Sequence, residues 1–193
     1  NAPRPSSKVI NFLIKMKMDK KYLEHVMTSG EAAMHAINQK KFGKTFFHLG
    51  PERDISLFEK VKDNRTDLYS CEFILCTGLF DDYDNDLDYY KKFLLKHISK
   101  KLICTNPDLI VHRGNMEELC AGSVAKVFED LGGEVFYFGK PHKEIYNMCF
   151  GSNEKVLAIG DNLRTDIKGA NNLKIDCIFI SEGVHRKEFS NFS

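Results

Sequence analysis

The sequence predicts an α/β protein whose sheets are mainly parallel. Apolar runs of strand length alternate with helical patterns along nearly the whole chain, an order typical of parallel strands joined by helices. The runs are short and continuously apolar, as expected for strands that are covered on both faces. The chain has 193 residues, so folding can bury roughly 70% of the surface that the unfolded chain exposes.

The helices and strands are predicted in order along the chain. Residues 6–24 repeat apolar side chains at helical spacing with lysines opposite, and Pro5 and Ser6 begin this helix. Gly50-Pro51 ends the first strand, and Gly132-Gly133 closes the longest of the later helices. The other helices are predicted over residues 30–38, 55–61, 86–98, 116–131, 142–150 and 165–173. The strands are predicted over residues 45–49, 72–77, 102–105, 135–138, 156–159 and 177–180.

Composition excludes several classes of protein. The 28 Lys and Arg nearly balance the 27 Asp and Glu, which argues against nucleic acid as the partner, because such proteins usually carry a basic excess. A membrane-spanning helix needs about 20 consecutive apolar residues, and the apolar runs here are far shorter. The six cysteines are scattered without a C-x-x-C pair, as in a cytoplasmic protein whose buried thiols stay reduced.

Two aspartates follow a predicted strand near the C-terminus. In parallel α/β folds ligands bind where strands end, and the run Ile159-Gly160-Asp161 is such an end. Asp166 follows in the first turn of the next helix. Two carboxylates placed in this way can hold Mg²⁺. The alternative is that Asp161 caps a turn and Asp166 caps the helix.

A lysine stands at the end of the preceding strand. Gly139-Lys140-Pro141 combines a strand end, a cation and a residue that often begins helices. Lys140 can neutralise a phosphate or a neighbouring carboxylate. It is not the lysine of a P-loop, because Glu134 stands where that motif needs glycine. On its own, a lysine in this position is more often a surface lysine than a functional one.

Together these segments resemble the haloacid-dehalogenase-like (HAD) superfamily of phosphohydrolases, and more narrowly its class IIA branch. That branch includes N-acetylglucosamine-operon-type phosphatases and pyridoxal-phosphate phosphatases. The matching segments occur in the order of the family, and they are residues 1–6, 104–108, 120–123, 139–141 and 159–167. The resemblance implies a Rossmann-like core with a parallel sheet, formed by residues 1–27 and 139–193. It also implies a large inserted α/β cap, formed by residues 28–138, through which such proteins often form a homodimer.

The resemblance further implies a Mg²⁺-dependent hydrolase of phosphomonoesters that acts on a small phosphorylated metabolite through an aspartyl-phosphate intermediate. Lys140 and Asp166 match catalytic positions of the family, and Asp161 and Asp166 match positions at its metal. Residues expected to contact the substrate are Asn1, Ala2, Asn106, Asp108, His112, Arg113, Lys140 and Asn162. The sequence does not indicate which metabolite is bound.

The sequence departs from the family at the nucleophile. The D-x-D pair that attacks the phosphorus belongs on a strand upstream of Asn1 and has no counterpart in this chain. We therefore expect these 193 residues to be part of a longer protein and to be inactive alone. The alternative is a catalytically inactive relative that binds a phosphorylated metabolite or a partner protein.

Overall fold

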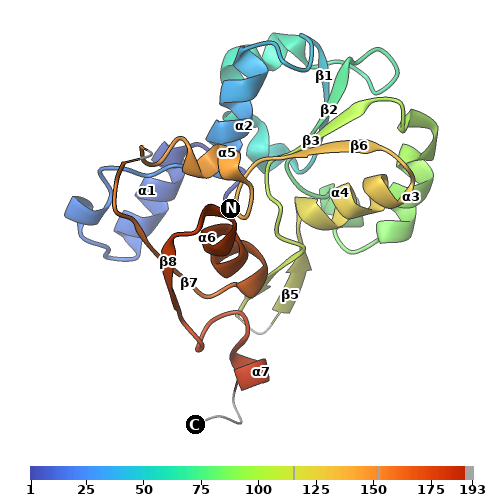
Figure 1. Ribbon diagram of the computed structural model, residues 1–193. Coiled ribbons are helices and arrows are strands. Elements are labelled where there is room, and N and C mark those ends of the chain that lie inside the picture. The colour runs from blue at the N-terminus through green and yellow to red at the C-terminus, as the bar shows by residue number, and fades with distance from the viewer. Residues whose placement is uncertain (115, 152, 190–193) are drawn as a thin grey trace.

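The larger of two parallel sheets has four strands. The computed structural model describes residues 1–114, 116–151 and 153–189 (Figure 1). The strand order of this sheet is β1-β2-β3-β6, and each strand pairs in parallel with its neighbours. Its strands are β1 (Phe46–Leu49), β2 (Phe73–Cys76), β3 (Lys101–Cys104) and β6 (Glu134–Tyr137). The first four predicted strands are therefore confirmed to within one residue at each end.

Helices cover both faces of this sheet (Figure 1). Successive side chains of a strand point to opposite faces. Leu75 accordingly joins the core beneath α2 (Ser29–Asn38), and Ile74 joins the core beneath α3 (Leu87–Leu94) and α4 (Ala121–Asp130). Burial on both faces explains why these strands are continuously apolar in the sequence.

A second sheet lies apart from the first and has two parallel strands, β7 (Leu157–Gly160) and β8 (Asp176–Phe179). These strands confirm the last two predicted ones to within one residue. Between them the chain forms a π-helical segment, η6 (Leu163–Ile167), followed by α6 (Lys168–Leu173). The fold class predicted from the sequence, α/β with parallel sheets, is thereby confirmed.

The remaining α-helices are α1, α5 and α7. α5 (Lys143–Tyr146) contacts both α2 and α6 and so connects the two parts of the molecule, and α7 (Arg186–Phe189) follows β8. α1 (Ser6–Lys15) has no buried residue. The predicted helix 6–24 stops early, because Lys17 has a φ of 66°, which a right-handed helix cannot continue. The short 3₁₀ helix η1 (Lys20–Tyr22) follows.

The predicted helix over residues 116–131 is wrong in its first part. β4 (Ile110–Arg113) and β5 (Met116–Leu119) pair as an antiparallel hairpin, and α4 begins only at Ala121. Gly114 lies between the two strands with a φ of 63°, a conformation that glycine adopts at no steric cost. Met116 is the first residue of the hairpin's second strand rather than the start of a helix.

The remaining short elements are 3₁₀ helices. The predicted helix 55–61 is a pair of them, η2 (Glu52–Leu57) and η3 (Glu59–Asn64). η4 (Asp81–Tyr83) and η5 (Leu95–His97) flank α3. Among the described residues, no helix is both long enough and apolar enough to cross a bilayer.

Truncating a core aromatic side chain should destabilise this fold. Phe128 of α4 is fully buried against the four-stranded sheet, so Phe128→Ala should lower the free energy of unfolding by about 3–5 kcal/mol. Phe12 of α1 is 61% exposed, so the matched variant Phe12→Ala should change it by about 0.5 kcal/mol or less. Urea titration followed by circular dichroism measures both values, and equal losses in the two variants would contradict the described packing.

Candidate functional site

The predicted catalytic pair comes together in space. Lys140 follows β6, and Asp166 lies in η6 after β7. The Lys140 ammonium forms an ion pair with Oδ1 of Asp166, whose side chain is only 10% exposed. Oδ2 of Asp166 accepts the backbone N–H groups of Asp161 at 3.2 Å and of Asn162 at 3.1 Å. One carboxylate therefore fixes both the lysine and the loop after β7.

Asp161 lies at the end of β7, as its place in the sequence predicts. Its Oδ2 accepts the backbone N–H of Val184 at 2.9 Å. The neighbouring Gly183 allows this contact, since a Cβ there would lie 2.1 Å from Oδ2 of Asp161. In the described parts of the chain, no three His, Cys, Asp or Glu side chains are grouped so that they could hold a metal ion. Asp161 and Asp166 alone do not complete a metal site.

Asp108 borders the same region from the turn after β3. Its carboxylate accepts a hydrogen bond from the Asn1 side chain at 3.1 Å. Burial raises the pKa of Asp108, and the positive charge of Lys140 acts in the opposite direction. The Asn106 side chain accepts the Asp108 backbone N–H at 3.1 Å and is buried. Asn106 thus shapes the turn. Of these two residues, only Asp108 lines the neighbouring cleft.

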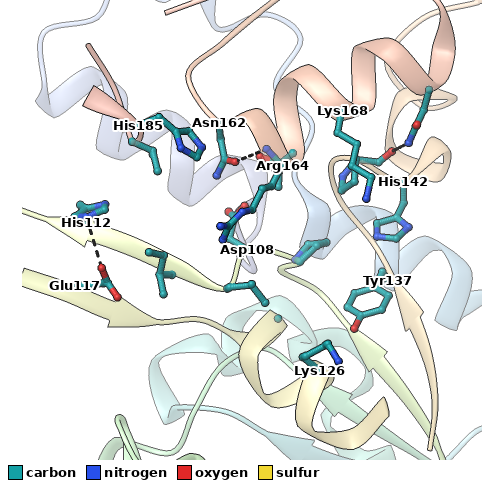
Figure 2. Close-up of a pocket in the computed structure, with 18 of the residues that line it drawn as sticks. Asp108, His112, Glu117, Lys126, Tyr137, His142, Asn162, Arg164, Lys168 and His185 are labelled. Atoms are coloured by element: carbon teal, nitrogen blue, oxygen red, sulfur yellow. Dashed lines mark hydrogen bonds and ion pairs between the residues drawn. The ribbon is translucent and has the colours of Figure 1, made fainter. Parts of the chain in front are cut away.

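A cleft of about 890 Å³ (Figure 2) is lined by Pro141 and Thr165, the sequence neighbours of Lys140 and Asp166, which do not line it themselves. One wall comes from the β4–β5 hairpin and α4, and the other from η6, α6 and the segment before α7. His112 lies on the hairpin wall, where its ring is 3.8 Å from the Glu117 carboxylate. Asn162 lies on the opposite wall and accepts the Arg164 backbone N–H at 2.9 Å.

Four of the predicted substrate contacts do not line the cleft, namely Asn1, Ala2, Asn106 and Lys140. Ala2 does not line it, and its carbonyl accepts the backbone N–H of Gly30 at 3.1 Å. The side chain of Arg113 and the nearby Asn115 lie outside the described residues. The predicted contact of Arg113 with the substrate therefore stays a prediction.

Sequence reasoning missed four side chains that line the cleft. The rings of Tyr137 and His142 stack with centroids 5.1 Å apart and an angle of 6° between their planes. Burial lowers the pKa of His142, which favours the neutral form of its ring. Arg164 and Lys168 add cations from η6 and α6 (Figure 2). His142 is two residues from Lys140, and Arg164 is three residues from Asp161. This closeness in sequence to predicted site residues is the signal by which they could have been found.

Comparisons with known proteins point to one family of hydrolases. The family model described as HAD-hydrolase-like matches residues 137–191, which contain the Lys140–Asp166 pair. A solved hydrolase of the haloacid dehalogenase-like family from Brucella suis is 31% identical. The match covers 98% of this chain and 76% of that one, with a TM-score of 0.87.

Other relatives give the same result. The ribonucleotide monophosphatase NagD of Escherichia coli is 32% identical over 150 residues, which are 76% of this chain and 58% of NagD. This chain thus spans less than two thirds of the curated relative. A p-nitrophenyl phosphatase from Archaeoglobus fulgidus shares the fold, with a TM-score of 0.72 at 19% identity over 100% of this chain and 75% of that one. These matches fit the class IIA branch that the motifs resemble.

The ordered motifs, the parallel α/β fold and the Brucella suis relative together show that the chain belongs to the haloacid dehalogenase-like family.

Proposed function

We propose that the protein carrying this chain hydrolyses small phosphomonoesters and that Lys140 binds the phosphate. The observation that carries the proposal is the ion pair between Lys140 and Asp166, whose sequence neighbours Pro141 and Thr165 line the cleft. A phosphomonoester is a dianion at neutral pH, and lysine binds phosphate as a point charge. NagD and the Archaeoglobus fulgidus protein are both phosphatases, which supports the same chemistry here.

The described residues have distinct tasks in this proposal. Asp166 holds the Lys140 ammonium in one position, so that little reorganisation is needed when phosphate binds. A cation fixed in this way stabilises the charge that develops on the phosphoryl oxygens in the transition state. Asn162, Asp108 and His112 border the cleft and would contact the rest of the substrate.

The attacking group is proposed from the family resemblance. There an aspartate of a D-x-D strand attacks the phosphorus and forms an aspartyl-phosphate, and the second aspartate of that pair acts as acid and base. The matched segments of this sequence do not include that strand. We therefore propose that the present residues supply phosphate and metal binding, and that these 193 residues alone have no turnover.

Asp161 would supply part of a Mg²⁺ site. Its carboxylate offers the hard oxygen ligands that Mg²⁺ prefers, and it lies next to the loop that Asp166 holds. When bound, the ion would offset the repulsion between carboxylates and the phosphate dianion. The oxygens of Asp166 already bond Lys140 and two backbone N–H groups, which favours its role in orienting Lys140 over direct metal binding.

We also propose that residues 28–138 form a cap over a core of residues 1–27 and 139–193. The four-stranded sheet falls within the proposed cap, and the parallel β7–β8 sheet falls within the proposed core. The two walls of the cleft come from these two parts, so the cap would recognise the leaving group and help to exclude water. A cytoplasmic location and a homodimer through the cap stay predictions.

Removing the Lys140 cation should abolish most of the activity. The variant Lys140→Met is made in the active protein, meaning the protein that also carries the D-x-D strand. It should lower kcat/KM for p-nitrophenyl phosphate by about 100- to 1,000-fold, as when one transition-state donor is lost. Lys62→Met is the matched control, because Lys62 forms an exposed ion pair with Glu59 in η3. Steady-state assays measure both variants. If wild type binds phosphate without turnover, the alternative of a non-catalytic binder is correct.

Removing the Asp161 charge should weaken the metal site. Asp161→Asn keeps an acceptor for the Val184 N–H but loses a carboxylate ligand, so Mg²⁺ affinity should fall at least about tenfold. Isothermal titration calorimetry with Mg²⁺ measures the affinity directly, and the Mg²⁺ dependence of turnover checks it independently. Unchanged values in both measurements would refute the metal role of Asp161.

A further inference from the structure

The Asn1 side chain is clamped onto the backbone of Lys140. The Lys140 N–H donates to Oδ1 of Asn1 at 2.7 Å, and Nδ2 of Asn1 donates to the Lys140 carbonyl at 2.9 Å. The same Nδ2 donates to Oδ1 of Asp108 at 3.1 Å. We call these three contacts the Asn1 clamp. It joins residues that are far apart in the sequence into one hydrogen-bonded unit.

The clamp uses both N–H donors of the Asn1 carboxamide. A primary amide has two N–H groups and one carbonyl oxygen, and the Lys140 carbonyl and the Asp108 carboxylate accept from its nitrogen. No side-chain donor is then left for a phosphoryl oxygen. The geometry favours a role in holding Lys140 over the substrate contact that the sequence resemblance implies for Asn1.

Gly139 makes room for the clamp. Its φ is 118°, in the region that favours glycine. A Cβ at this position would lie 2.6 Å from Oδ1 of Asn1, closer than atoms can approach. The glycine before Lys140 therefore allows the Asn1 amide to reach the backbone of the next residue.

Asp108 connects the clamp to the four-stranded sheet. Its backbone N–H is held by the buried Asn106 side chain, in the turn that follows β3. Lys140 follows β6, which pairs directly with β3. The clamp thus ties the turns after two neighbouring strands to each other, while Asp166 holds the far end of the Lys140 side chain from η6, which follows β7.

We propose that Asn1 is a positioning residue for Lys140, which it holds by the backbone so that the ammonium faces both Asp166 and the bound phosphate. This inference rests on the phosphatase function proposed above. It assigns Asn1 no contact with the substrate. Asp108 acts as the anchor that orients the Asn1 amide.

Substitutions at both ends of the Asn1–Asp108 contact test the proposal in the active protein. Asn1→Ala should lower kcat/KM for p-nitrophenyl phosphate by about 100-fold, as expected for a displacement of about 1 Å at a reacting group. Asn1→Asp keeps the acceptor for the Lys140 N–H but places a second carboxylate beside Asp108, so it should be impaired as well. Adding Asp108→Asn restores a donor to this contact and should recover at least about tenfold of the loss, measured as a double-mutant cycle.

Asn147→Ala is the matched control, because Asn147 is exposed after α5 and does not line the cleft. It should leave kcat/KM unchanged. A wild-type value of kcat/KM in Asn1→Ala overturns the proposal. Failure of Asp108→Asn to relieve Asn1→Asp also overturns it, since a merely structural loss would not respond to the restored donor.

A measurement without substrate separates this inference from the proposed function. Hydrogen exchange of the Lys140 amide, followed by NMR, should accelerate about fivefold or more in Asn1→Ala, the factor for one ordinary hydrogen bond. If wild type hydrolyses no phosphomonoester, the proposed function fails, yet faster exchange in Asn1→Ala still supports the clamp. Unchanged exchange overturns the clamp whatever the activity.

Discussion

The ion pair between Lys140 and Asp166 is the interaction on which the rest of the site depends. The Asp166 carboxylate is nearly buried, so its lost hydration must be replaced by other polar groups. The Lys140 ammonium and the N–H groups of Asp161 and Asn162 do this together. Removing one partner from such a group leaves an uncompensated charge, which usually costs more stability than the intact pair contributes. The lysine and the loop after β7 are therefore fixed by one carboxylate.

The same pair also joins segments that follow the two parallel sheets. Lys140 leaves the four-stranded sheet after β6, and Asp166 follows β7 of the two-stranded sheet. The cleft opens between walls that belong to these two parts (Figure 2). The pair thus fixes the segment that follows β6 to η6 at the proposed phosphate site. The Asn1 clamp adds a second constraint at the backbone of Lys140.

All six strands predicted from the sequence are present, because burial on both faces leaves a continuous apolar run that is readable without a partner strand. The β4–β5 hairpin was not predicted, since Glu117 and Glu118 interrupt any apolar run in β5 and only pairing with β4 defines the strand. The family resemblance likewise placed Lys140 and Asp166 in one site, which their ion pair agrees with. The Asn1 clamp could not be predicted, because a side-chain rotamer and a tertiary contact decide it.

The site combines groups that are tightly constrained with groups that are free to vary. Asn1, Lys140 and Asp166 have multiple hydrogen-bonded partners, so a substitution at any of them disturbs the others. On the cleft wall, His112 and Glu117 form a more exposed pair at 3.8 Å, and pairs of this kind contribute little to stability. Residues of the hairpin can therefore change with little cost to the fold. Under the proposed function, this difference would let leaving-group specificity change in the proposed cap while the proposed phosphate site at Lys140 stays the same.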